Sequence, residues 1–121
     1  MTEDENKTHI MHAIINLNGN RFVLMDGQGK HGYSFSEAFS HIINYENQKE
    51  IDEYWEKLIS QGGSPSQCGW LKDPFGISWQ VNPSNMGDMM ANPQKSNQIM
   101  SATLKMTKID MNQLEKIYTA K

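Results

Sequence analysis

The stretch QCGWLKDPFGISWQVNP, residues 67–83, decides the fold because it predicts a β-hairpin with one strongly apolar side. Pro74 fixes φ at the second position of a four-residue turn, Asp73–Gly76. Strand-forming residues flank this turn on both sides, which is typical of two antiparallel strands. With a loop of that length, Trp70 is expected to face Trp79 across the ribbon.

Alternation of side chains gives the predicted hairpin two different faces. One face is apolar and is expected to pack in the core, and it consists of Cys68, Trp70, Ile77, Trp79 and Val81. The other face is thinner and more polar, and it consists of Gly69, Leu71, Ser78 and Gln80. We interpret the second face as one wall of a small-molecule cavity, with Leu71, Ser78 and Gln80 as candidate ligand-binding residues.

Length and composition limit the possible classes of protein. A chain of 121 residues can build one modest core, and we expect a single domain over residues 9–121 after a polar tail at residues 1–8. The formal net charge of -3 gives no electrostatic attraction to nucleic acid or to an anionic membrane. The single cysteine, Cys68, cannot form an internal disulfide, and no apolar stretch has the length of a membrane span. These features predict a cytoplasmic protein.

Two strand-like runs occupy residues 9–27, HIMHAIINL and NRFVLMDG, and they are joined through an Asn-Gly pair. This pair between apolar runs is a strong hairpin signal. Residues 28–36 are polar and contain glycine, so we expect a loop there. Residues 39–45, FSHIINY, then predict another strand.

The next segment predicts an amphipathic helix. Asn47, with Glu50 three residues later, is typical of a helix start, and the glycines at 62 and 63 end the helix. The apolar residues follow the spacing of one helical face, and they are Ile51, Tyr54, Trp55, Leu58 and Ile59. A strand, a helix and then the tryptophan hairpin therefore follow one another in the chain.

The sequence after the hairpin is rich in methionine and predicts helices. We expect a short helix over residues 86–90, a longer one from about Pro93 through Met106, and a last helix whose cap is formed by Asp110 and Gln113. Methionines on a helix face indicate core or interface packing, and an adaptable binding surface is the alternative.

Four segments carry a resemblance to a known family: IMHAIINLNGNRF, ENQKEIDEYWEKLISQGG, QCGWLKDPFGISWQVNP and LKMTKIDMNQLEKIY. They closely resemble the 3-demethylubiquinone-9 3-methyltransferase domain family, also called PhnB-like proteins, from about Ile10 to Tyr118. That family belongs to the vicinal oxygen chelate superfamily, with glyoxalase I, extradiol dioxygenases and bleomycin-resistance proteins. The resemblance implies an α+β fold with a glyoxalase-like βαβββ module, a mixed curved sheet and C-terminal helices. Relatives carry a further strand, helix and strand before HIMHAIINL, so the resemblance implies an N-terminally truncated module.

The resemblance also implies a divalent metal, held by His and Glu side chains, that polarises vicinal oxygens of a substrate. The usual ligand position of the last strand falls on Gln80, whose amide is a poor replacement for a carboxylate. Ile14 stands where relatives commonly carry an acid, two residues beyond His12. Phe39 stands at another ligand position, with His41 two residues later on the same face. His12, His41 and Gln80 are therefore weak metal candidates, and both histidines are candidate cavity residues.

Three functions remain open for such a chain. Methyl transfer is not expected, because no glycine-rich turn of the nucleotide-binding kind joins a parallel strand to a helix. Our first hypothesis is a small-molecule binding protein of unknown substrate. The alternatives are a divalent-metal-dependent lyase, isomerase or dioxygenase assembled across a dimer, and a truncated regulatory or partner subunit. Exposed edges of the shortened sheet predict a homodimer.

Overall fold

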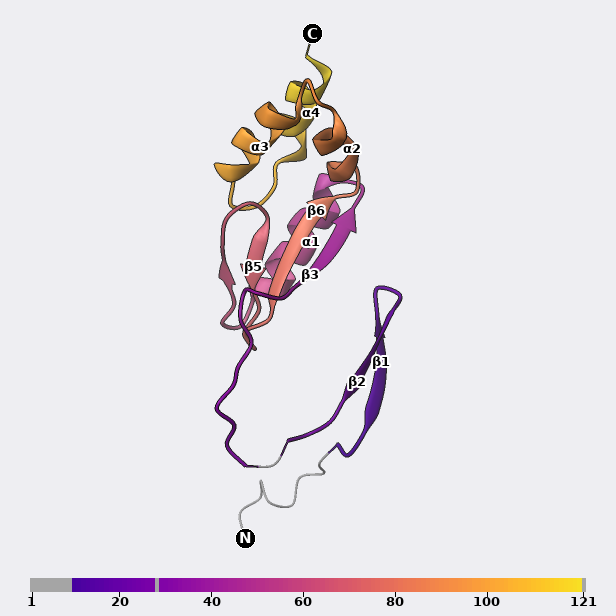
Figure 1. The fold of residues 1–121 in the computed structure, drawn as a ribbon, viewed down its shortest axis with the longest axis vertical. Helices are drawn as coiled ribbons and strands as arrows, with labels where there is room; N and C mark the ends of the chain where they lie inside the picture. The colour runs from indigo at the N-terminus through magenta and orange to yellow at the C-terminus, as the bar shows by residue number, and fades with distance from the viewer. Residues whose placement is uncertain (1–9, 28, 121) are drawn as a thin grey trace. The chain divides into compact units, whose positions relative to one another are not determined.

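The computed structural model describes residues 10–27 and 29–120. The chain divides into two compact units, Met1–Tyr33 and Ser34–Lys121, whose elements are drawn in Figure 1. The predicted polar tail at residues 1–8 lies outside the described residues. None of the described helices has the length and apolar character needed to cross a bilayer.

The first unit contains an antiparallel hairpin formed by β1 (Ala13–Leu17) and β2 (Asn20–Leu24). Asn18 has φ 51° and Gly19 has φ 81°, the left-handed pair of a tight hairpin turn. The predicted Asn-Gly hairpin is thus confirmed. Residues 29–36 form neither helix nor strand, in agreement with the predicted loop, while Gln28 lies outside the described residues.

The second unit has the element order of a βαβββ module. Its strands are β3 (Ser40–Tyr45), β4 (Ser64–Pro65), β5 (Trp70–Lys72) and β6 (Ser78–Pro83). They form a four-stranded sheet in the order β3-β6-β5-β4, in which β3 runs parallel to β6 and the other neighbours are antiparallel. The predicted mixed sheet is therefore present.

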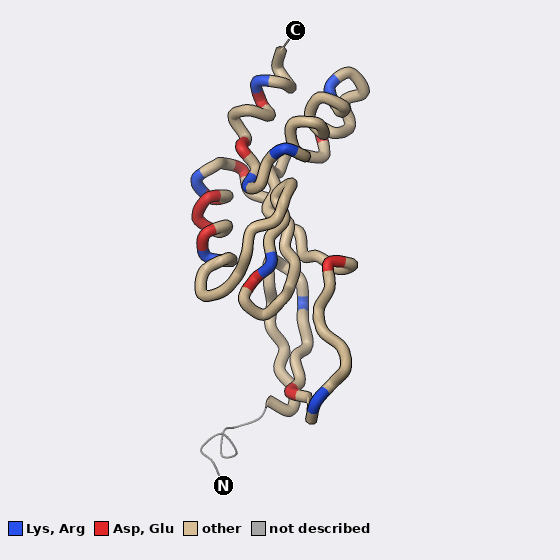
Figure 2. Tube along the Cα trace, turned by 90° about the vertical axis from the view of Figure 1, so that its left-hand side faces the viewer, with Lys and Arg blue, Asp and Glu red and all other residues tan. Residues whose placement is uncertain are grey.

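The helix α1 (Gln48–Ile59) follows β3 and covers one face of this sheet (Figure 1). Its start is as predicted, because Asn47 Oδ1 accepts a hydrogen bond from Glu50 N at 2.9 Å and Asn47 Nδ2 donates to Glu50 Oε1 at 2.8 Å. Acidic residues lie along this helix between basic residues near its two ends, as Figure 2 shows. The apolar side packs on a core cluster formed by Ile51, Trp55, Leu71, Val81 and Met111.

Three further helices lie at one end of the sheet: α2 (Met86–Ala91), α3 (Ser96–Leu104) and α4 (Met111–Thr119) (Figure 1). The cap of α4 is confirmed, because Asp110 Oδ1 accepts from Gln113 N at 3.2 Å. The helix α3 is shorter than predicted at both ends. A second core cluster joins these helices and consists of Met89, Ile99, Ala102, Met106, Ile109 and Leu114.

The register of the tryptophan hairpin differs from the prediction by one residue. Leu71 pairs with Trp79 and Trp70 pairs with Gln80, so the loop holds five residues and the predicted pairing of the two tryptophans is wrong. The cause is the Asp73 carboxylate. Its Oδ1 accepts from the backbone N–H groups of residues 75 and 77 at 2.9 Å and 3.0 Å, and its Oδ2 accepts from Trp79 Nε1 at 2.9 Å. These bonds hold Ile77 in the loop and move Leu71 onto the core face.

A polar joint connects the C-terminal helices to α1. Gln48 Nε2 donates to the Ile109 carbonyl and to Asp52 Oδ1, each at 2.9 Å, and Gln48 Oε1 accepts from Met111 N at 2.8 Å. Lys108 Nζ lies 2.8 Å from Asp52 Oδ1. Hydrogen bonds from Lys108 and Gln48 hold the pKa of Asp52 below its usual value.

Candidate functional site

The sheet face opposite α1 carries the candidate site, and we call it the Gln80 face. The register places Trp70 beside Gln80 and places Ile42 on the other side of Gln80. Side chains two positions along each strand share this face. Its members are Ser40, Ile42, Asn44, Trp70, Lys72, Ser78, Gln80 and Asn82.

Gln80 lies at the centre of this face and is held in one orientation. Its Nε2 donates a hydrogen bond to Ser40 Oγ at 2.9 Å, which ties β6 to β3. Within the described part of the chain, no group donates a hydrogen bond to Gln80 Oε1. A half-buried amide carbonyl is therefore available to accept a hydrogen bond from a ligand.

A cavity of about 330 Å³ lies between the Gln80 face and the helices α2 and α3. We call it the Trp70 cavity. Met86 and Met90 are one helical turn apart on α2, as are Met100 and Leu104 on α3, so each pair reaches the cavity from one helix face. The residues lining it are Cys68, Trp70, Gln80, Asn82, Met86, Met90, Met100, Thr103 and Leu104.

Cys68 enters the cavity wall because of an unusual backbone. Cys68 has φ 61° and Gly69 has φ 81°, two consecutive left-handed residues before β5. This conformation lets both residues donate backbone hydrogen bonds, from Cys68 N to the Met106 carbonyl and from Gly69 N to the Thr107 carbonyl, each at 2.8 Å. The bonds hold the loop against the end of α3, where the thiol is half-buried.

A smaller cavity of about 200 Å³ is also lined by Trp70. Ser78, only 2% exposed, borders it, and both signs of charge are present through Glu37 and Lys72. The two cavities thus border Trp70, Ser78 and Gln80, which lie on the Gln80 face.

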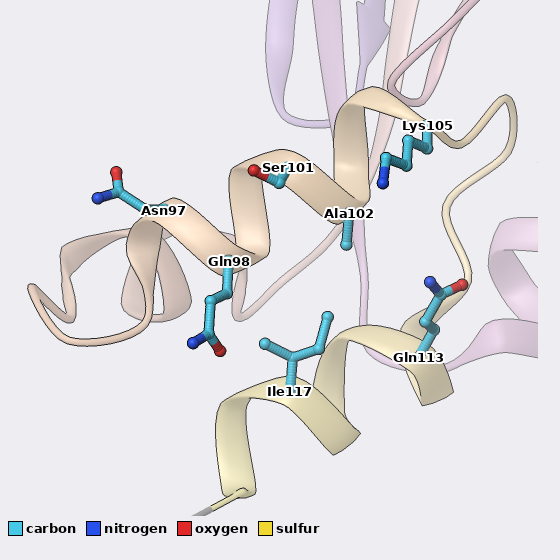
Figure 3. A pocket seen from close by; sticks show the side chains of 7 residues that line it. All are labelled: Asn97, Gln98, Ser101, Ala102, Lys105, Gln113 and Ile117. Atoms are coloured by element: carbon cyan, nitrogen blue, oxygen red, sulfur yellow. The ribbon is translucent and has the colours of Figure 1, made fainter.

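A third hollow of about 480 Å³ lies between α3 and α4 (Figure 3). Gln98 points from α3 toward Ile117 of α4, and Lys105 points from α3 toward the same groove. Exposed polar side chains therefore form much of its rim. No pattern in the sequence predicts this groove, because it depends on how two separate helices cross.

The structure separates the predicted site residues. Ser78 and Gln80 border the cavities, and their contact with a ligand stays a prediction. The predicted facing of Leu71 is wrong: it adjoins the smaller cavity, but its side chain is 1% exposed and packs in the core beneath α1. His41 lies on that same α1 side, with its ring 4.9 Å from the Trp79 ring, because it pairs with Trp79. His12 belongs to the first unit.

A divalent metal site of the superfamily type does not fit these residues within one chain. Among the described residues, no three side chains of His, Cys, Asp or Glu come together as a ligand set. His41 and Gln80 lie on opposite faces of the sheet, because neighbouring positions on β6 alternate in direction. We therefore derive no metal-dependent step.

Several cavity residues were missed by sequence reasoning. The methionine spacing on α2 and α3 predicted helix faces, but which face meets the sheet depends on the polar joint at Gln48 and on the loop at Cys68. Those contacts link segments that are far apart in sequence. Cys68 and Trp70 were expected on the core face and line the cavity instead. The other missed residues are Asn82, Met86, Met90, Met100, Thr103 and Leu104.

Two solved structures of other proteins have a similar fold. A PhnB protein from Bacillus cereus, provisionally named a 3-demethylubiquinone-9 3-methyltransferase, has 31% identity and a TM-score of 0.58, over 63% of this chain and 66% of its own. Protein PA1353 from Pseudomonas aeruginosa shares the fold, with 24% identity and a TM-score of 0.52 over 62% of this chain and 63% of its own. The alignments thus span less than two thirds of each of those chains.

No curated protein gives a significant match to the sequence. The family described as 3-demethylubiquinone-9 3-methyltransferase matches residues 1–82, which include the first hairpin and the βαβββ module through most of β6. The glyoxalase-like fold, the tryptophan hairpin and this match agree with one another. The chain belongs to the 3-demethylubiquinone-9 3-methyltransferase, or PhnB-like, family.

Proposed function

We propose that this protein binds a small molecule in the Trp70 cavity and does not transfer methyl groups. The observation that carries the proposal is the convergence of an aromatic ring, two amides and several flexible apolar side chains on one cavity of about 330 Å³. Concave sites with a mainly apolar lining and a few polar groups are typical of small-molecule binding. The single cysteine is consistent with action in the reducing cytoplasm.

The family name points to methyl transfer, but the local structure favours binding alone. Nucleotide-type methyl donors are bound by a glycine-rich turn between a parallel strand and its helix. In the described part of the chain, both strands of the parallel pair, β3 and β6, precede a helix. The connections are Glu46–Asn47 before α1 and Ser84–Asn85 before α2, and neither contains glycine. Neither connection therefore lets a donor phosphate or carboxylate approach the backbone closely.

The proposal is tested by exposing the immobilised protein to a metabolite extract and identifying the released compounds by mass spectrometry. The matched variants are Trp70→Ala, which removes a cavity wall, and Phe75→Ala, which removes an aromatic ring that is 82% exposed on the same hairpin. A compound retained by the wild type and by Phe75→Ala but lost by Trp70→Ala supports the proposal. Equal retention by all three proteins, or no retention, contradicts it.

We also propose that the protein acts as a homodimer. Its support is the outer edges of β3 and β4 in the four-stranded sheet, which no strand of the described residues pairs with, together with the two-stranded β1–β2 ribbon. Isolated two-stranded ribbons are marginally stable in water, and free strand edges tend to pair. Native mass spectrometry over a range of concentrations tests this, and a monomer at the highest concentration would rule the dimer out.

A further inference from the structure

We infer that the Trp70 cavity selects uncharged aromatic molecules with a hydrogen-bond donor at one edge. The inference rests on the proposed function and specifies the class of ligand. It follows from three properties of the lining. The lining residues are uncharged, the apolar wall is formed by flexible methionines, and the polar side chains offer hydrogen-bond acceptors.

Charge is absent from the lining of the Trp70 cavity within the described residues. The smaller cavity, which Trp70 also lines, has Glu37 and Lys72, so the two cavities differ in charge. The basic residue next to Leu104, Lys105, points instead into the groove between α3 and α4 (Figure 3). A charged ligand in the Trp70 cavity would lose hydration without gaining an opposite charge, which is strongly unfavourable.

The apolar wall favours an aromatic ring. Three methionines, Met86, Met90 and Met100, lie across the cavity from the sheet that carries Trp70. Thioether sulfurs make favourable contacts with aromatic rings, and the unbranched side chain adapts to ligands of different outline. Trp70 adds a flat indole surface for ring stacking.

The polar wall sets the orientation of such a ligand. Gln80 Nε2 already donates to Ser40 Oγ, so Gln80 presents its carbonyl oxygen as an acceptor. Thr103 Oγ1 donates to the Ile99 carbonyl at 2.8 Å, so this hydroxyl also offers an acceptor. These two acceptors match an O–H or N–H group on the ligand, and the neutral Asn82 amide in the same lining can accept or donate.

Two fluorescent dyes with the same rings test the inference. N-phenylnaphthylamine is uncharged and carries one N–H, and anilinonaphthalenesulfonate adds a sulfonate to that framework. We expect saturable binding of the neutral dye by the whole chain, and binding of the sulfonate that is about tenfold or more weaker because no cation compensates its desolvation. The measurement is the fluorescence enhancement on titration of each dye with protein.

Variants that add a positive charge at the cavity rim test whether the Trp70 cavity causes the selectivity between the two dyes. Met100 is 43% exposed at the cavity rim, so Met100→Lys adds a cation there without burying it. We expect this variant to strengthen sulfonate binding and weaken neutral-dye binding. The matched control is Gln98→Lys, which adds the same charge to the opposite side of α3 and is expected to leave both affinities unchanged.

The outcomes separate the inference from the proposed function. Equal wild-type affinities for the two dyes, both reduced by Trp70→Ala, would overturn the charge selectivity while supporting a ligand-binding cavity. Neutral-dye binding that responds to neither Trp70→Ala nor Met100→Lys would overturn the site, and so would the failure of both dyes to bind. A sulfonate that binds more tightly to Met100→Lys than to Gln98→Lys supports the inference, even if Trp70→Ala does not fold.

Discussion

At the scale of single residues, Gly69 shows how one backbone position controls the cavity wall. Its φ is +81°, and a Cβ added there would lie 2.9 Å from Ile109 Cγ1 and 3.0 Å from the Val81 carbonyl oxygen. We expect Gly69→Ala to lower the free energy of unfolding by about 1–3 kcal/mol through strain and this close approach.

Urea denaturation measures the change at Gly69, with Gly87→Ala as the matched control. Gly87 lies in α2, and a Cβ there would meet nothing within 4 Å. Alanine is favoured over glycine in a helix, so the control should be more stable than the wild type by about 0.5–1 kcal/mol. If Gly69→Ala and Gly87→Ala change the free energy of unfolding in the same direction, the close approach at Gly69 does not explain the change.

Tyr45 is expected to make the folded state less stable at alkaline pH. Burial, with smaller contributions from Tyr54, Glu50 and Glu53, raises the pKa of Tyr45 from 10.0 to about 12. The unfolded chain therefore loses this proton first, so the stability contributed by the neutral phenol is complete below pH 10 and is lost as the pH rises toward 12. Tyr45→Phe should show a weaker decline in urea midpoint over this interval, and an identical decline would contradict the assignment.

At the scale of elements, the joint at Gln48 holds the C-terminal helices to α1. Its amide makes hydrogen bonds to the Ile109 carbonyl, to Met111 N and to Asp52. Gln48→Ala leaves two part-buried backbone groups without this partner, so we expect a loss of about 1–3 kcal/mol in unfolding free energy.

A control for the joint comes from an exposed contact on the same helix. Lys57 pairs with Glu53 at 3.0 Å where both side chains are largely exposed, and such pairs contribute little. Lys57→Ala should therefore leave the free energy of unfolding nearly unchanged. Thermal or chemical denaturation of both variants checks the difference. Equal effects would mean that the joint at Gln48 does not secure the helices.

Local patterns predicted most elements but not their register. The Asn-Gly turn, the Asn47 and Asp110 caps and the apolar stripe of α1 depend on residues close in sequence, and all three features are present. The tryptophan hairpin differed because the Asp73 side chain bonds within the loop and to Trp79, which backbone turn preferences do not include. One extra loop residue was enough to exchange Leu71 and Trp70 between faces.

At the scale of the whole molecule, both core clusters lie in the second unit, Ser34–Lys121. We expect residues 34–121 alone to fold cooperatively, because each cluster finds all its members within this segment. Circular dichroism during urea denaturation of the segment measures this. A broad, non-cooperative transition would show that the second unit depends on residues 1–33.

The candidate site could be predicted only in part from the sequence. Gln80 and Ser78 follow from strand alternation, which acts over a few residues. The Trp70 cavity also needs the faces of α2 and α3 and the loop at Cys68, and these meet through contacts between distant segments. Sequence periodicity predicts which face of a helix is apolar, but it does not predict which element that face packs against.

The parallel pairing of β3 with β6 has a kinetic consequence. Ser40 meets Ser78 only after α1 and two intervening strands have been crossed, whereas β5 and β6 are joined by a short loop. Closing a long segment costs more chain entropy than closing a hairpin. Within residues 10–27 and 29–120, β3 is an edge strand that pairs with β6 alone, so we expect it to join the sheet last and to detach first in native-state fluctuations. Each detachment breaks the hydrogen bond from Gln80 to Ser40. Opening of this sheet edge therefore also frees the Gln80 side chain in the wall of the Trp70 cavity.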